Sequence, residues 1–153
     1  MPTVDTKYFG TMEYREESVF DFPHGLPAFE NERNFVLIER PENQPLVFLQ
    51  SLSRPNLCFL VFPIWAVDPD YQLGVSREDL EALGLDPERQ PAQGSDVLVL
   101  ALVSMRDKFS ATVNLMAPIV VNLKTRRAQQ AIRQDSLYSY QHVLQPSAAE
   151  RAC

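Results

Sequence analysis

Histidine and cysteine, the side chains most often used as bases, nucleophiles and metal ligands, are rare in this chain. His24 lies in a loop rich in proline and glycine, His142 lies near the C-terminus, and neither has metal-ligand spacing to a second histidine or a cysteine pair. Cys58 lies inside an apolar run, where a thiol is usually buried and inert, and Cys153 is the last residue. No nucleophile elbow, phosphate-binding glycine loop or helix-borne His-Glu pair occurs, although a triad assembled in space leaves no such pattern. We therefore expect a protein that is not an enzyme, with no cofactor and no metal.

The more prominent chemical feature is a group of carboxylates in the middle of the chain. Two of them immediately precede a tyrosine, and more lie on the predicted helix that follows. Such side chains suit an arginine-rich face on a partner, with the tyrosine ring as an anchor. The alternative is local, because acidic side chains also stabilise the positive N-terminal end of a helix. The binding hypothesis names Asp68, Asp70, Tyr71, Glu78 and Glu81.

A rigid loop at residues 22–30 is the second candidate site. Two prolines around a glycine exclude regular structure there. Proline fixes the backbone, so the loop can present Leu26, Phe29 and Glu30 to a partner at low entropic cost. The structural alternative is that the phenylalanine rings seal one end of the fold, which we favour for Phe22.

The charge is unevenly distributed, and this argues against nucleic acid as a partner. The net charge is −6: residues 1–96 carry 17 acidic and 7 basic side chains, and residues 97–153 carry 3 and 7. An acidic protein repels phosphate backbones, so a basic protein is the better partner. Lys124, Arg126 and Arg127 leave single-strand binding by an open β-barrel as the alternative function.

Length and composition predict one β-rich domain. The 153 residues fit a single hydrophobic core, and 45% of them are hydrophobic. Fifteen aromatic residues favour a pleated sheet, and 12 prolines leave little room for long helices. No apolar stretch of membrane-spanning length and no secretory signal is found, so we expect a cytoplasmic protein without membrane contact.

Several elements are predicted from local patterns. Residues 46–52 and 57–62 flank a proline-asparagine turn and predict a hairpin. Residues 97–103 are apolar throughout, which indicates a strand covered on both faces or a buried helix, and the turn signals at its ends favour the strand. Residues 113–123 alternate around Pro118, which implies an edge or a bulge.

The expected helix covers residues 76–84. Ser76 can cap it, Asp79 occupies the third helical position, and Gly84 can end it in the left-handed conformation. Residues 125–134 also have helical propensity, since they contain no glycine or proline.

Five segments, in order, resemble the flagellar assembly factor FliW family. They cover residues 22–30, 49–52 with 55–59, 68–71, 96–100 and 114–122, followed by Thr125, Arg126, Gln130, Tyr138 and His142. Each motif is weak alone, but five in the right order across residues 3 to 144 are specific. Two alanines depart from the pattern, because Ala28 and Ala128 stand where the family usually has glycine. If those positions have positive φ, each alanine costs about 1 kcal/mol, or the turns differ here.

The resemblance implies a fold and a function. It implies an all-β, small closed pseudo-barrel over residues 1–144 with one short helix near 76–84, and a loose tail at 145–153. It also replaces the helical interpretation of residues 125–134 by a strand end, a turn and a last strand near 130–133. Members of the family bind flagellin and antagonise the carbon storage regulator, a small RNA-binding translational repressor, which couples the flagellin level to its translation.

Overall fold

The computed structural model describes residues 1–105 and 111–144, and most of its regular structure is β-sheet. Two short helices, α1 (Ile64–Val67) and α2 (Arg77–Ala82), and two 3-10 turns complete it. The strands are β1 (Thr3–Thr6), β2 (Gly10–Glu13), β3 (Phe20–Asp21), β4 (Asn34–Glu39), β5 (Val47–Ser51), β6 (Cys58–Pro63), β7 (Val97–Met105), β8 (Ala111–Val113), β9 (Ile119–Asn122), β10 (Ala128–Gln130) and β11 (His142–Val143). The expected tail at residues 145–153 lies outside the described residues.

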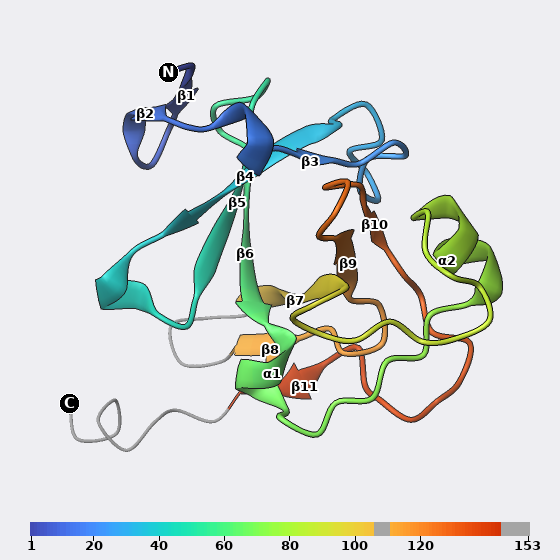
Figure 1. The fold of residues 1–153 in the computed structure, drawn as a ribbon. Coiled ribbons are helices and arrows are strands. Elements are labelled where there is room, and N and C mark those ends of the chain that lie inside the picture. Colours follow the sequence, from blue (N-terminus) through green and yellow to red (C-terminus); the bar gives the residue numbers. More distant parts are fainter. Residues whose placement is uncertain (106–110, 145–153) are drawn as a thin grey trace.

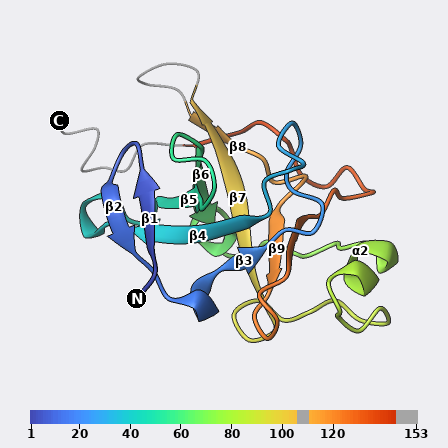
Figure 2. The ribbon, with the colours of Figure 1, turned by 90° about the horizontal axis from the view of Figure 1, so that it is seen from above.

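The main sheet curls into a half barrel (Figures 1 and 2), which confirms the predicted class of fold. Its strand order is β10-β9-β7-β6-β5-β4-β3, and every pair along this path is antiparallel. A bridge between Asp21 and Arg127 joins the two ends of this path. Strands β1 and β2 form a separate two-stranded sheet.

Strand β7 separates two hydrophobic cores, as its uninterrupted apolar sequence predicts. Leu98, Leu100 and Leu102 pack into a core inside the half barrel. Val97 and Val99 pack on the opposite face of the strand against the segment that carries α1 and α2. The strand is therefore covered on both sides, so alternate residues serve different cores.

The alternating run at residues 113–123 is divided in two by a turn. Strand β8 pairs with the end of β7, and β9 pairs with its beginning. Between them, Asn114 Oδ1 accepts hydrogen bonds from the backbone N–H groups of Met116 and Ala117, both at 3.0 Å. The prediction of an edge or a bulge at Pro118 is therefore wrong, because the chain turns there and β9 is paired on both sides, and Asn114 satisfies the backbone of the turn.

The helix predictions are partly right. Ser76 Oγ accepts from the Asp79 N–H at 3.1 Å, and α2 ends before Gly84, whose φ is 73°. The expectation of a single helix is wrong, because α1 follows β6 directly. Its residues continue an apolar run, so no change of period marks its start.

The C-terminal strands also differ from the prediction in position. No helix forms over residues 125–134: β9 ends at Asn122, a turn follows, and β10 starts at Ala128. The strand expected near 130–133 begins two residues earlier, and the prediction that it is the last strand is wrong, because β11 follows it and pairs with β8.

Candidate partner-binding surfaces

The loop at residues 22–30 is a tight turn built around a glycine. The Phe29 N–H donates to the Leu26 carbonyl at 2.7 Å, with Pro27 and Ala28 between them, and Ala28 has a φ of 71°. A Cβ atom on Gly25 would lie 2.5 Å from the Glu30 Cα, so only glycine fits there. Thus the glycine usual at position 28 is replaced by an alanine in a left-handed conformation. Ala128, by contrast, is absent from the positive-φ positions, and Arg126 has a φ of 66°.

Burial divides the residues predicted in this loop into different roles. Phe22 and Leu26 are 0% and 2% exposed and belong to the barrel core, so the expectation that Leu26 faces a partner is wrong. Phe29 is half-buried, packs edge-on against Phe59 and lies beneath the Arg54 guanidinium. Glu30 is exposed, and its carboxylate accepts from the Ala28 N–H at 3.3 Å. Apolar side chains preceding and within a proline turn point inward here, which local sequence does not reveal.

A groove runs between this loop and β10. It has a volume of about 390 Å³. We call it the loop groove, and its lining residues are His24, Gly25, Pro27, Glu30, Gln129, Gln130 and Ile132.

The second predicted surface lies on residues 68–96, here called the acidic segment. It contains eight carboxylates and two arginines, a net −6, which equals the net charge of the whole chain. Asp70, Glu78 and Glu81 are exposed, and Asp68 is half-buried. The acidic segment runs around α2 on one side of the molecule (Figure 1).

Two arginines form ion pairs with some of these carboxylates. Arg77 pairs with Glu81 at 3.5 Å and with Glu88 at 2.8 Å. Arg89 pairs with Asp86 at 3.7 Å and with Asp96 at 3.4 Å. Within the described ranges 1–105 and 111–144, the ion pairs include neither Asp68 nor Asp70 nor Glu78. Asp79 is also outside these ion pairs but accepts a hydrogen bond from the Gln129 side chain, which leaves Asp68, Asp70 and Glu78 as the carboxylates available to an external cation.

The prediction that Tyr71 anchors a partner is wrong. Its ring is 5% exposed and packs in the second core, and its hydroxyl donates to the Leu115 carbonyl at 2.6 Å. Burial raises the pKa of this phenol, opposed by its hydrogen bond from Arg133. Tyr71 thus holds the start of the acidic segment against the turn between β8 and β9, which contains Leu115.

Arg133 is a buried arginine that contacts Tyr71 and its neighbours, and the sequence analysis did not identify it. Its guanidinium, 4% exposed, lies over the rings of Tyr71 and Tyr138 and donates to the Gln72 carbonyl at 2.6 Å. It also makes a two-point ion pair with Asp135, with nitrogen–oxygen distances of 2.8 and 2.9 Å. A Cβ atom on Gly74 would lie 2.6 Å from its Nη2, so that glycine makes room for it. No periodic pattern in the sequence predicts that an arginine at this position is buried.

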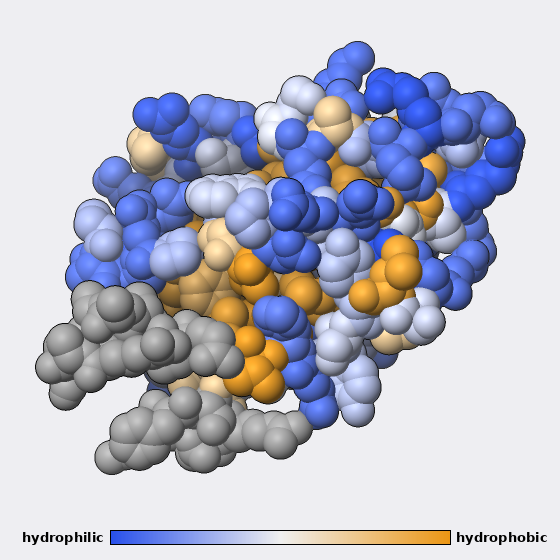
Figure 3. Space-filling view, turned by 90° about the horizontal axis from the view of Figure 1, so that it is seen from below, coloured by the Kyte–Doolittle hydropathy of each residue, from blue (hydrophilic) through white to orange (hydrophobic). Residues whose placement is uncertain are grey.

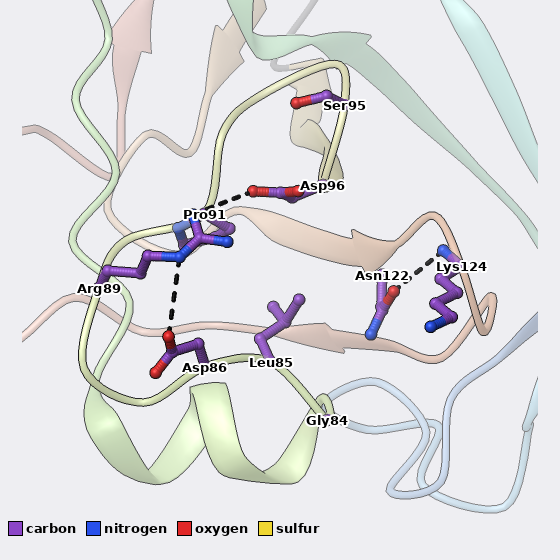
Figure 4. Close-up of a pocket in the computed structure, with 9 residues that line it drawn as sticks. All are labelled: Gly84, Leu85, Asp86, Arg89, Pro91, Ser95, Asp96, Asn122 and Lys124. Carbon is purple, nitrogen blue, oxygen red and sulfur yellow. Dashed lines mark hydrogen bonds and ion pairs between the residues drawn. The ribbon is translucent and has the colours of Figure 1, made fainter.

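A shallow cleft of about 290 Å³ lies between the acidic segment and the end of β9 (Figure 4). Its polar groups are mostly bonded to one another. Asn122 donates to the Leu83 carbonyl at 2.8 Å and accepts from the Lys124 N–H at 3.0 Å, and Arg89 lies between Asp86 and Asp96. The cleft therefore helps to hold the acidic segment against the sheet.

Two of the three cations that suggested nucleic-acid binding make internal contacts. Arg127 donates to the Ala82 carbonyl at 3.2 Å, at the C-terminal end of α2. Arg126 lies over the ring of Phe20 at 5.9 Å from its centroid. Both side chains stabilise the junction of β10 with its neighbours, which accounts for them without a nucleic acid.

An exposed apolar face is a surface that the sequence analysis missed. Figure 3 views the molecule from the side on which α1, β8 and β11 lie in Figure 1, and apolar side chains gather in the middle of this face. Trp65 on α1 is 60% exposed, Met105 at the end of β7 is 55% exposed, and Val143 on β11 is 60% exposed. The strand register places the side chains of Met105 and Val143 on opposite faces of the β7-β8-β11 sheet, so we use the name apolar face for the surface around Trp65 alone. Exposed apolar patches on a folded protein often mark an interaction site.

The described residues contain neither a metal-binding cluster nor a membrane-spanning helix. No set of three or more histidine, cysteine, aspartate or glutamate side chains within residues 1–105 and 111–144 is placed to hold a metal ion. Over the same ranges, no helix is both long and apolar enough to cross a membrane.

The fold and these surfaces define a small half-barrel β-protein with an acidic surface and an apolar one. The sequence profile described as "FliW protein" matches residues 3–144, so the chain belongs to the FliW family. The flagellar assembly factor FliW of Bacillus subtilis (strain 168) is 34% identical over 140 residues, which cover 91% of this chain and 94% of that protein. That of Desulfitobacterium hafniense (strain DSM 10664 / DCB-2) is 36% identical over 146 residues, covering 95% and 92%.

A solved structure shows the same architecture. The crystal structure of the flagellar assembly factor FliW superimposes with a TM-score of 0.80 at 30% identity, covering 95% of this chain and 98% of that one. The family predicted from the five sequence motifs is therefore confirmed.

Proposed function

We propose that this protein binds flagellin and the carbon storage regulator in the cytoplasm, and thereby couples the flagellin level to flagellin translation. It acts by holding proteins, without turnover of a substrate and without direct contact with nucleic acid or membrane. Free flagellin and the repressor compete for one antagonist, so a rise in flagellin releases the repressor. The names of the relatives, flagellar assembly factors, support a role in building the flagellum.

The observation that carries the proposal is the concentration of net charge on the acidic segment. A repressor that binds RNA presents cationic side chains, and these are complementary to the unpaired carboxylates of Asp68, Asp70 and Glu78. The remaining residues contain equal numbers of acidic and basic side chains, so the attraction is directed to one side. We propose that the acidic segment, including Glu81, steers and holds the repressor.

Flagellin requires a different surface. A filament subunit packs against its neighbours through exchangeable end segments, which we expect to be apolar helices. Helices of this kind bind exposed apolar surface. Leu26 is buried, so the loop at residues 22–30 is a poor place for this contact. We propose that the apolar face around Trp65, which is 60% exposed on α1, receives flagellin.

The test of the repressor site is a double charge reversal, Asp68→Lys with Asp70→Lys. The matched control is Glu16→Lys with Glu17→Lys, which changes the net charge equally on an exposed turn between β2 and β3. We expect the first pair to weaken repressor binding by at least about a hundred-fold at low salt, and the control to have a much smaller effect. Flagellin binding should be unchanged in both.

The test of the flagellin site is Trp65→Asp, with Tyr8→Asp as the matched control. Both aromatic rings are about equally exposed, at 60% and 62%. Flagellin binding, measured by calorimetry, should fall by about ten-fold or more only in the Trp65 variant. The proposed repressor site would be contradicted if both double charge-reversal variants bound the repressor with equal affinity. The nucleic-acid alternative would replace the proposal if the purified chain bound single-stranded RNA at physiological salt and retained no protein partner.

A further inference from the structure

The outer edge of β10 and of the residues after it presents unused backbone groups. The N–H groups of Ala131 and Arg133 donate to the carbonyls of Pro118 and Met116 at 2.8 and 2.9 Å, on the β9 side. In an antiparallel pair the intervening residues face the other way, which gives Gln130 and Ile132 outward N–H and C=O groups. Within residues 1–105 and 111–144, no backbone hydrogen bond to these groups is formed.

This edge is open because β3 is too short to cover it. Strand β3 contains only Phe20 and Asp21, and its bridge to Arg127 is the last pairing on that side. Beyond it, the chain turns away into the proline loop at residues 22–30. The loop groove lies between this loop and the edge formed by Gln129, Gln130 and Ile132.

The walls of the groove define the chemistry of an occupant. Ile132 is 60% exposed and offers an apolar contact. Glu30 lies on the loop side, and the Gln129 side chain is hydrogen-bonded to Asp79 of α2, which brings the acidic segment to the other side. A strand laid here would meet negative charge on both sides and an apolar side chain in the groove.

We propose that this edge binds an extended, basic peptide segment of a partner protein, which pairs with Gln130 and Ile132 as an added strand. Strand addition uses backbone hydrogen bonds for affinity and alternate side chains for selectivity. Apolar residues of the peptide lie on Ile132, and its lysine or arginine side chains lie toward Glu30 and the acidic segment. The inference depends on the geometry of the edge, and it stands or falls separately from the proposed function.

The test uses a blocked hexapeptide of alternating lysine and valine as the probe. Amide hydrogen exchange of the full chain is followed by NMR with and without the peptide. We expect exchange at Gln130 and Ile132 to slow by about ten-fold or more, whereas Ala131 and Arg133 already donate within the sheet and change little. Saturation with the peptide without protection of Gln130 and Ile132 would overturn the proposal.

Two further comparisons make the test specific. Only alternate amides of an added strand face the edge, so peptides N-methylated on one or the other alternate set should differ, with one binding and the other not. On the protein, Ile132→Pro removes an outward N–H and should abolish binding, whereas Ile132→Val retains it. Equal binding of both methylated peptides overturns strand addition even if the proline variant does not fold. Equal binding of a glutamate–valine peptide overturns the basic character of the occupant.

Discussion

The backbone N–H of Asp21 donates to the carbonyl oxygen of Arg126 at 2.9 Å, across the gap between the two ends of the main sheet. Arg126 adopts a φ of 66° to place this carbonyl, and its guanidinium lies over Phe20 on the facing strand. Backbone and side chain of one residue thus join β3 to the turn before β10. Beyond this junction the sheet opens into the loop groove.

The two alanines at positions usually occupied by glycine should respond in opposite directions. Ala28→Gly relieves a left-handed alanine and is expected to stabilise the protein by up to about 1 kcal/mol. Ala128→Gly adds backbone freedom in a buried strand position and is expected to destabilise it by about 1 kcal/mol. Urea unfolding measures both, and stabilisation by Ala128→Gly would contradict the backbone geometry described here.

Replacement of the buried Arg133 should be far more damaging than replacement of an exposed arginine. Arg133→Ala removes two ring contacts and the bonds to Asp135 and the Gln72 carbonyl, and we expect a loss of about 3 kcal/mol. Arg89→Ala breaks two surface ion pairs and should cost less than about 1 kcal/mol. Similar midpoints for both variants in chemical denaturation would show that Arg133 is not a central contact.

The ion pair of Asp135 should make stability depend on acid pH. Its hydrogen bonds from Arg133 hold the pKa of the carboxyl below its ordinary value of 3.8. A folded pKa below the unfolded one stabilises the fold at pH values above 3.8, and this contribution is lost as the pH falls through the folded pKa. The stability difference between the natural sequence and Asp135→Asn should therefore be largest near neutrality and shrink below about pH 4. A difference that stays constant into acid would contradict this.

The thiol of Cys58 should react slowly in the native protein. Burial raises its pKa to about 11 from an ordinary value of 9.0. In a variant with Cys153→Ser, alkylation by iodoacetamide near pH 8 should be about a hundred-fold slower in the folded protein than in denaturant. The native rate should keep rising with pH beyond 9, and a plateau there would show that the thiolate forms at its ordinary pKa.

Local sequence predicts those parts of this fold that short-range chemistry determines. Pro55 and Asn56 mark the β5–β6 hairpin, and Ser76 and Gly84 delimit α2. The uninterrupted apolar run of β7 corresponds to a strand between two cores. The family was identified because several such local motifs occur in a fixed order.

Residues whose role depends on distant contacts were predicted less well. Leu26 and Tyr71 lie in turns, where no period tells which side chains face inward, and both are buried. Arg133 is buried because two tyrosines and Gly74, far away in sequence, form a place for it. The exposure of Trp65 depends on how α1 packs against β7, a contact between segments far apart in the sequence.

The position of β7 between two cores has a consequence for the lifetime of the protein in a cell. If residues 64–96 detached from the sheet, Val97, Val99 and Ala101 would be exposed to water. Loss of the barrel core would expose the opposite side of the same strand. Opening either part alone therefore has a high free-energy cost, because it exposes apolar side chains of β7. We expect a protease that cuts transiently opened chains to depend on unfolding of the whole domain. Degradation of surplus copies should therefore follow the global free energy of unfolding, and a bound partner should slow it.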